Sequence, residues 1–288
     1  MIFVILVAIV GACIGSFLTV VAHRLPQIMI QEWRADVADF INHSIQNPTL
    51  NHHKKAIFGS LTDHAKPISL ALPRSHCVHC QKTISWYDNI PILSYVLLMG
   101  RCRHCQHKIS KSYPITELGC AVLSALVVLR FGLNEQGLLS LLFVWFLLVL
   151  SMIDLRHQLL PDRLVLPLGM IGLVANAFLI FTTPTQAIFG AVAGFILLWL
   201  LNTIHRLIAH RDGMGLGDAK LLAALGAWLG LTHLPLVLFL AAVFGVLAGI
   251  FYRLHGRQEF AFGPYLAMGG LLVLFFGDWL LDYLFGIV

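Results

Sequence analysis

The sequence predicts an all-α polytopic membrane protein of about eight transmembrane helices, with a small zinc-binding domain between the first and the second. Apolar residues make up 58% of the 288 residues and charged residues only 11%, whereas soluble domains average about 45–50% apolar and about 25% charged. Apolar runs long enough to cross a bilayer, which takes ~20 residues, recur along the chain. Lys and Arg are concentrated in alternate loops. These observations exclude a soluble enzyme, a disordered tail and a soluble repeat protein.

The apolar runs locate the expected helices. The first run covers residues 1–22 and is followed by His23 and Arg24. A secretory signal has its basic residues before the apolar run, so we expect a retained first span. Seven further spans are expected at residues 114–131, 137–153, 164–182, 186–208, 219–233, 234–252 and 264–287. A separate amphipathic helix is expected at 31–45. The predicted domains are 1–22, a cytosolic insert at 23–112, and a seven-helix core at 113–288.

Basic residues predict the orientation of these spans. Eleven of the 19 Lys and Arg residues lie between the first and the second span. With eight spans and the N-terminus outside, all the basic residues except Arg130 fall on the cytosolic side. Cytosolic loops carry an excess of Lys and Arg, so this arrangement is the predicted topology.

Four cysteines in the insert predict a metal site. Cys77-x2-Cys80 and Cys102-x2-Cys105 are separated by 21 residues, and the segments CVHCQKTIS and CRHCQHKIS around them repeat each other. This spacing is close to that of structural sites in which four thiolates hold Zn²⁺. Two disulfides are the alternative, but disulfides are rare in the cytosol. Because four thiolates leave no position for water, we expect a structural zinc.

Two carboxylates stand at the edges of predicted spans. Asp154 closes the third span, and Asp218 opens the sixth within GMGLGDAKLLAALG. The predicted topology places both at the cytosolic membrane edge, where ionisable residues are candidates for function. Two close carboxyl groups share a proton and can act as acid and base in peptide hydrolysis. Gly215 and Gly217 would let the backbone before Asp218 leave helical geometry and approach a substrate strand.

These acids also have other interpretations. Asp154 could be a solvated charge at a helix end, and Asp218 could cap its helix. Asp162, which follows Pro161, is typical of the first residue of a helix. An ion-transport path would require polar residues near mid-membrane, where the spans carry almost no charge. Binding of nucleic acid through the basic insert is not expected, since the topology already accounts for those charges.

The motifs together resemble the type IV prepilin peptidases, which act as leader peptidase and N-methyltransferase. The resemblance covers most of the chain and rests on GSFLTVVAHRLP (15–26), PRSHCVHC (73–80), NIPILSY (89–95), GRCRHC (100–105), YPITE (113–117), IDLRHQLLPD (153–162), GLGDAKLLAALG (215–226) and FGPYLAMGG (262–270). GLGD alone is also similar to presenilin-like proteases, but those lack the paired Cys motifs.

The resemblance implies the function and the site residues. Asp154 and Asp218 would be the catalytic pair, supported by the motif residues Gly215, Gly217 and Lys220. The enzyme would cleave the basic leader of type IV prepilins and pseudopilins after a Gly, and then methylate the new N-terminus, commonly Phe, with S-adenosylmethionine. The resemblance also implies that the protein lies in the bacterial cytoplasmic (inner) membrane, with the lipid bilayer as a partner, and that it does not bind nucleic acid. Gly100 and Glu117 are the candidate contacts of the cofactor.

Overall fold

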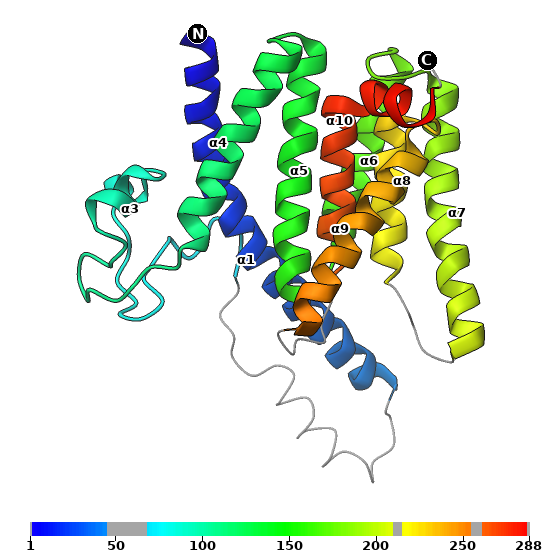
Figure 1. Cartoon of the computed structure of the whole chain (residues 1–288). Coiled ribbons are helices and arrows are strands. Elements are labelled where there is room, and N and C mark those ends of the chain that lie inside the picture. Colours follow the sequence, from blue (N-terminus) through cyan, green and yellow to red (C-terminus); the bar gives the residue numbers. More distant parts are fainter. Residues whose placement is uncertain (1, 45–67, 210–214, 255–260, 287–288) are drawn as a thin grey trace. The chain divides into compact units, whose positions relative to one another are not determined.

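The computed structural model describes residues 2–44, 68–209, 215–254 and 261–286. These residues form helices and two isolated β-bridges, but no strand. The elements are α1 (Ile2–Ser44), the 3-10 helix η2 (Trp86–Asn89), α3 (Leu93–Leu97), α4 (Ser112–Phe131), α5 (Glu135–His157), α6 (Asp162–Ala177), α7 (Pro184–Ala209), α8 (Leu216–Leu229), α9 (Leu234–Leu254) and α10 (Gly263–Phe285) (Figure 1). The predicted all-helical membrane fold is confirmed.

Six of these helices are long and apolar enough to cross a membrane, namely α1, α4, α5, α7, α9 and α10. The remaining two predicted spans are also helices, but α6 has 16 residues and α8 has 14. At 1.5 Å per residue, α8 is only about 21 Å long, which is less than the ~30 Å of a typical hydrocarbon core. The helices thus occur at all eight expected positions, and full spanning by α6 and α8 stays a prediction.

One predicted helix boundary is wrong. The span at 1–22 and the amphipathic helix at 31–45 were expected to be separate, but α1 runs without a break from Ile2 to Ser44, with Pro26 inside it. A proline removes one intrahelical hydrogen bond and bends a helix without necessarily ending it. The residues next to Pro26 contain no glycine, which would further weaken the helix. Their helix propensity is therefore sufficient for α1 to continue past the proline.

The chain divides into two compact units. The helical unit comprises Met1–Leu18 and Ile115–Val288, and the cysteine unit comprises Thr19–Pro114. Helix α1 contributes to both units.

Helix α8 is central to the helical unit and packs against α6, α7 and α10. Its contact with α7 is a backbone crossing at Gly190 and Gly226, where a Cβ on Gly190 would lie 2.5 Å from the Gly226 carbonyl oxygen. Small residues permit this close approach between membrane helices. The short helix is therefore enclosed on several sides, and ten of its 14 residues are buried.

A buried hydrogen-bond network fixes the C-terminal end of α8. Trp228 is fully buried and donates its indole N–H to the carbonyl oxygen of Leu168 at 2.7 Å. The side chain of Asn176, also fully buried, donates to the carbonyl oxygens of Ala227 and Trp228 at 2.8 and 3.0 Å. Its oxygen accepts from the backbone N–H groups of Phe181 and Thr182, both at 3.0 Å. The amide thus ties the end of α6 to the end of α8.

Candidate active site and metal centre

The two candidate aspartates lie on the buried faces of their helices. On α5, Asp154 follows Phe143, Leu147 and Leu150 at intervals of four, three and four residues, and all three are fully buried. This spacing defines one side of a helix. Asp154 retains only 5% exposure, so the alternative of a solvated charge at the helix end is wrong.

Asp218 occupies the equivalent place on α8. It lies in the first turn, ahead of the fully buried Leu221, Leu222 and Leu225, and is 8% exposed. The N-cap of α8 is Gly215, without a side-chain cap bond. Asp218 is therefore not the capping residue, contrary to the alternative interpretation.

The carboxyl groups of Asp154 and Asp218 interact electrostatically. Two residues that are 64 positions apart in the sequence are thereby brought to one place in the helical unit. The Oδ1 atom of Asp218 is buried and has no hydrogen-bond partner among the described residues. A buried carboxyl oxygen is costly without a partner, and sites that tolerate this cost are often functional.

A third segment positions Asp154. The backbone N–H of Gly263, the first residue of α10, donates to Asp154 Oδ2 at 3.0 Å. A Cβ on Gly263 would lie 2.5 Å from the same oxygen. The absence of a side chain is therefore what lets the start of α10 approach this carboxyl group. Pro264 follows immediately in the first turn of α10, where a proline is well tolerated.

Leu160 packs against both glycine-containing segments. A Cβ on Gly217 would lie 3.0 Å from Leu160 Cβ, and one on Gly263 would lie 3.3 Å from Leu160 Cδ1. Gly215, in contrast, has φ −71° and ψ 146°, which any residue adopts. In this structure a side chain at Gly217 would crowd Leu160. The approach of Gly215 and Gly217 to a substrate strand stays a prediction.

An ion pair joins α6 to α8 beside Asp218. Lys220 Nζ lies 2.7 Å from both carboxylate oxygens of Asp162. Asp162 is the first residue of α6, as expected. The sequence placed Lys220 in the same motif as Asp218 but did not indicate its partner, because 58 residues separate the two charges.

The four cysteines of the insert form one cluster in the cysteine unit. The Sγ atoms of Cys77, Cys80, Cys102 and Cys105 lie within 4.8 Å of one another, and all four thiols are free. Four thiolates about 2.3 Å from a tetrahedral zinc have their sulfur atoms about 3.8 Å apart. The observed distance between Cys77 Sγ and Cys105 Sγ is 3.8 Å. The donor set and its spacing fit a tetrahedral metal ion, and disulfides are not formed.

The repeat seen in the sequence is a repeat of structure. In the first Cys-x2-Cys turn, or knuckle, the backbone N–H of Cys77 donates to the carbonyl oxygen of Lys82 at 2.9 Å. The backbone N–H of Gln81 donates to the carbonyl oxygen of Cys77, also at 2.9 Å. In the second, Cys102 and Gln106 make the same two bonds at 2.9 and 3.0 Å. Gln81 and Gln106 have φ of 58° and 57°. Each knuckle therefore presents two sulfur atoms from the same tight turn.

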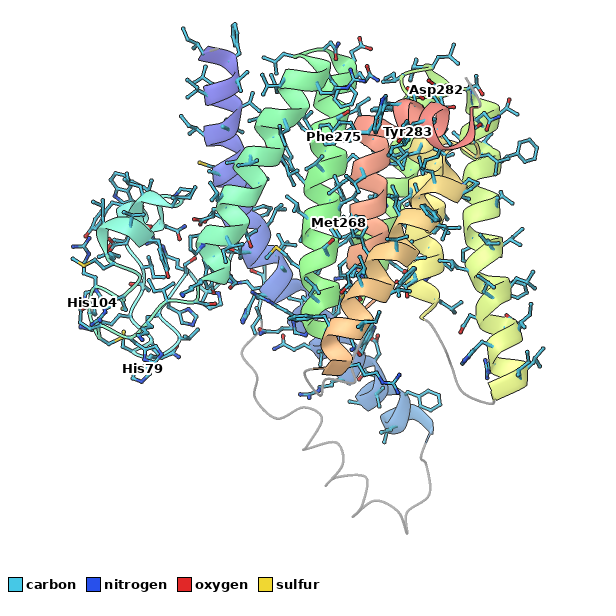
Figure 2. All side chains as sticks on the ribbon, in the orientation of Figure 1. His79, His104, Met268, Phe275, Asp282 and Tyr283 are labelled. Carbon is cyan, nitrogen blue, oxygen red and sulfur yellow. The ribbon has the colours of Figure 1, made fainter. Side chains whose placement is uncertain are left out.

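The electrostatics of the cysteine unit favour at least one thiolate. Backbone N–H groups of Cys105 and His104 lower the pKa of the Cys102 thiol to about 7. Nearby, Arg103 pairs with Asp88 at 2.6 Å and holds the pKa of that carboxyl group below its usual range. The imidazole rings of His79 and His107 stack with their centroids 4.5 Å apart. His79 and His104 are labelled on this unit in Figure 2.

The two candidate cofactor contacts belong to different units. Gly100 has φ 67°, and a Cβ there would lie 2.8 Å from the Tyr95 hydroxyl oxygen. A side chain at this position would therefore clash with Tyr95, and a role for Gly100 in binding the cofactor stays a prediction. Glu117 is 7% exposed on α4.

Sequence reasoning missed three features of the site. These are the packing of Leu160, the ion pair of Lys220 with Asp162, and the hydrogen bond from Gly263 to Asp154. The motif segments 153–162, 215–226 and 262–270 contain all of these residues. Their shared presence in family motifs was the available signal, although it does not specify contacts.

The comparisons with known proteins agree with this architecture. Residues 9–131 match the model of the bacterial peptidase A24 N-terminal domain, and residues 141–250 match that of the type IV leader peptidase family. Proteins named prepilin leader peptidase/N-methyltransferase are similar along nearly the whole chain. Those of Stutzerimonas stutzeri and Pseudomonas aeruginosa are 40% and 41% identical, each covering 96% of this chain and 91% of the relative. The one of Aeromonas hydrophila is 41% identical, covering 95% and 90%.

No solved structure matches the chain. The two family models together cover most of the helical unit and the whole cysteine cluster. The chain belongs to the type IV leader peptidase family.

Proposed function

We propose that this protein cleaves the basic leader of type IV prepilins and pseudopilins after a Gly, and then methylates the new N-terminal residue. The observation that carries the proposal is the pair of buried, interacting carboxyl groups of Asp154 and Asp218. The printed names of the relatives support the two activities and the prepilin substrates. No role in binding nucleic acid is proposed.

In the proposed hydrolysis, one carboxyl group is ionised and the other is protonated. The ionised group takes a proton from water as the water oxygen attacks the scissile carbonyl carbon, and the protonated group gives its proton to the carbonyl oxygen. As the tetrahedral diol collapses and the C–N bond breaks, the departing nitrogen takes a proton from the first carboxyl group, and one diol hydroxyl returns its proton to the second, which restores the pair. General acid–base assistance of this kind contributes about 10²–10⁴-fold.

The surrounding residues support this chemistry by holding the carboxyl groups in place. The Gly263 N–H orients Asp154 through Oδ2. Leu160 fills the space between the start of α8 and the start of α10. The pair of Lys220 and Asp162 ties the first turn of α8 to α6. Gly215 and Gly217 are proposed to admit the substrate backbone.

We propose that the four cysteines hold a structural Zn²⁺. The closed set of four sulfur ligands would join the two knuckles and leave no position for a reacting water. Structural zinc contributes directly to folding of small domains. We propose that residues 23–112, which contain this site, are associated with the methylation step.

S-Adenosylmethionine is the proposed methyl donor, and it supplies an electrophilic methyl group when bound. Gly100 and Glu117 are the proposed contacts of the cofactor, as expected from the sequence. No step of the methylation is assigned to particular residues.

The proposed setting is the bacterial inner membrane, with eight spans, the N-terminus outside, and both the aspartates and the cysteine unit on the cytosolic side. The distribution of Lys and Arg supports this topology. It also places the aspartates on the side where a basic leader would be retained.

The test is intact mass spectrometry of a prepilin that is co-expressed with this protein. Wild type is expected to remove the leader and add the mass of one methyl group. Asp154→Asn and Asp218→Asn are expected to leave the prepilin at full length. Asp282→Asn, which changes an exposed acid on α10, is the matched control and is expected to process normally. Full processing by either aspartate variant would refute the catalytic assignment.

A further inference from the structure

An exposed apolar surface lies at one end of the cysteine unit. On α3, Leu93, Val96 and Leu97 are all exposed, and intervals of three and four residues place them on one side of the helix. Met99 follows the helix and is 86% exposed. We call these four residues the apolar tip. Within this unit, α3 lies at the opposite end from His79 (Figures 1 and 2).

The two sides of α3 are arranged in the reverse of a helix on a soluble domain. Its half-buried polar side chains make contacts within the unit, where the Ser94 hydroxyl donates to the carbonyl oxygen of Ile90 at 2.7 Å and the Tyr95 hydroxyl lies beside Gly100. Residues 89–100 contain no charged side chain. A contiguous exposed apolar surface of this kind marks a contact with a membrane or with another protein.

A pair of like charges next to the tip indicates an anionic partner. An antiparallel β-bridge joins Arg101 and Lys108, and residues opposite each other in such a bridge hold their side chains close together, which is unfavourable for like charges. Both side chains are exposed, and neither makes an ion pair with any residue that the structure describes. The equivalent bridge of the first knuckle joins His76 and Thr83 instead. The basic pair is therefore specific to the knuckle that follows α3, and an anionic group from outside would relieve its repulsion.

Backbone hydrogen bonds connect this pair directly to the tip. The N–H of Arg101 donates to the carbonyl oxygen of Leu98 at 3.0 Å, and the N–H of Ile109 donates to that of Gly100 at 2.8 Å. Trp86, on the neighbouring η2, is 76% exposed. Apolar side chains with Trp and basic residues next to them are typical of segments that lie in the headgroup region of a bilayer.

The chain itself keeps the basic pair near a bilayer. Helix α4 is a candidate membrane span and begins at Ser112, four residues after Lys108. Four residues reach at most about 14 Å. The first residues of α4 belong to the cysteine unit, so this unit contains a point at which the chain enters the membrane.

The charge of the unit favours an anionic lipid surface over a second copy of the chain. Asp88 is the only acid within residues 68–111, and it pairs with Arg103 at 2.6 Å. The basic residues of this range are Arg74, Lys82, Arg101, Arg103, Lys108 and Lys111. Four thiolates on a zinc would offset only part of this positive charge. A symmetric dimer through the tip would bring two such basic surfaces together, whereas anionic lipids attract them.

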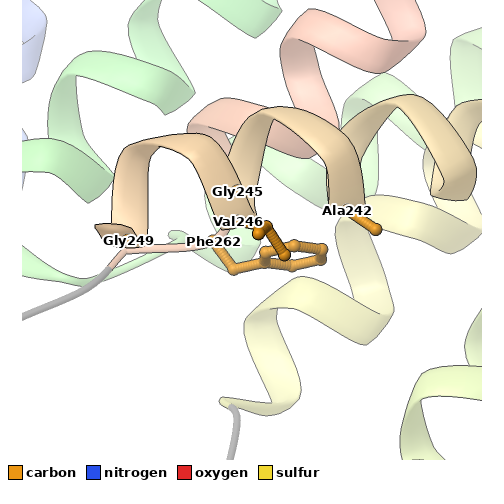
Figure 3. A pocket seen from close by; sticks show the side chains of 5 residues that line it. All are labelled: Ala242, Gly245, Val246, Gly249 and Phe262. Atoms are coloured by element: carbon orange, nitrogen blue, oxygen red, sulfur yellow. The ribbon is translucent and has the colours of Figure 1, made fainter. Parts of the chain in front are cut away.

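A pocket in the helical unit gives a contrast. It is lined by Ala242, Gly245, Val246, Gly249 and Phe262 (Figure 3). None of these residues has a polar side chain, so nothing in the pocket distinguishes lipid from any other apolar partner. The tip differs because a basic pair adjoins it.

We propose that the apolar tip inserts into the headgroup region of the bilayer and that Arg101 and Lys108 bind the phosphate groups of anionic lipids there. The cysteine unit would then be held against the membrane surface at the tip as well as through α1 and α4. This inference goes beyond the proposed function, because it uses neither the aspartates nor a substrate.

The first test measures which molecules contact the tip. A photo-crosslinking benzoylphenylalanine replaces Leu97 in the full-length protein, which is reconstituted in vesicles of phosphatidylethanolamine and phosphatidylglycerol. Val78 is the matched control position, because this apolar residue of the first knuckle is 75% exposed and Leu97 is 70% exposed. Phospholipid adducts, measured by mass spectrometry of the digested protein, are expected at position 97 at least about tenfold more often than at 78.

Two results of this test would overturn the proposal. One is an equal yield of lipid adducts at the two positions. The other is a crosslink from position 97 to a second copy of the chain, or to a peptide of the helical unit, in place of lipid.

The second test concerns the basic pair and uses the same readout at position 97. Vesicles of phosphatidylcholine alone lack anionic headgroups, and they are expected to lower the yield of lipid adducts at least about threefold. Arg101→Gln combined with Lys108→Gln is expected to cause a similar loss in the phosphatidylglycerol vesicles. Arg74→Gln combined with Lys82→Gln removes the same charge from the first knuckle, and this control is expected to stay within about twofold of the unsubstituted pair.

The comparison of lipids uses a single protein, so its result does not depend on how the Gln variants fold. An unchanged yield of adducts in phosphatidylcholine would refute the binding of anionic phosphate groups by Arg101 and Lys108. An equal loss for the two double variants would refute the assignment to this pair.

Discussion

Replacing Gly263 by Ala is expected to reduce leader cleavage by about 10²-fold. The added Cβ would lie 2.5 Å from Asp154 Oδ2 and 3.1 Å from its Cγ, whereas favourable contacts are about 3.5–4.0 Å long. The carboxyl group or the start of α10 must therefore move by about 1 Å. A misplacement of this size in a catalytic group costs about 10²-fold in rate, which is about 2.7 kcal/mol of transition-state free energy.

The assay is the initial rate of leader removal from a purified prepilin, normalised to folded enzyme. Gly119→Ala is the matched control, since a Cβ at this membrane-helix position meets nothing within 4 Å. It is expected to cleave at about the wild-type rate. A Gly263→Ala enzyme that cleaves within about twofold of wild type would refute the argument that this close approach positions Asp154.

A graded comparison strengthens the same reasoning. A Cβ on Gly217 meets Leu160 Cβ at 3.0 Å, so Gly217→Ala requires a shift of only a few tenths of an ångström. Its loss of rate is expected to be smaller than that of Gly263→Ala. Adding Leu160→Val, which shortens the opposing side chain, is expected to leave the Gly217→Ala defect in place because the Cβ remains.

Three other predictions follow from the structure. Cys77→Ser is expected to lose about one zinc per chain, measured by inductively coupled plasma mass spectrometry, and stoichiometric zinc in a variant lacking all four clustered cysteines would refute the site. Lys220→Met is expected to slow cleavage while changing the melting temperature little, because a partly exposed ion pair contributes only about 0–1 kcal/mol to stability. Equal rates for Lys220→Met and wild type would show that the pair with Asp162 does not position α8. Asn176→Ala leaves two buried and two half-buried backbone groups without their partner. It is expected to destabilise the fold by about 1–3 kcal/mol, seen as a lower melting temperature with little change in the rate per folded molecule.

The sequence predicted the helices and the pairing of the two Cys-x2-Cys turns well, because both are local patterns. Each apolar run became a helix, and the two Cys-x2-Cys turns gave two knuckles with the same hydrogen bonds. The break expected after residue 22 was wrong, since Pro26 alone does not end α1. Local polarity reports where a chain leaves an apolar environment, but a helix can continue beyond that point.

For the site, the sequence indicated which side chains matter but not how they meet. Asp154 and Asp218 were indicated by their positions at the edges of predicted spans. The contacts of Leu160 and the hydrogen bond from Gly263 depend on how α5, α8 and α10 pack, and residues 109 positions apart in sequence carry no local sign of that contact.

The sequence by itself determined the membrane fold class, the positions of the helices, the four cysteines that form one cluster and the two candidate acids. These features follow from the composition, the length of the apolar runs and the short motifs, which can be recognised in local stretches of sequence. Only the tertiary structure decided that the acids are buried together, that Gly263 orients Asp154, and that Lys220 pairs with Asp162. Those features depend on close packing between helices, where a single Cβ is enough to change the distance between two distant segments.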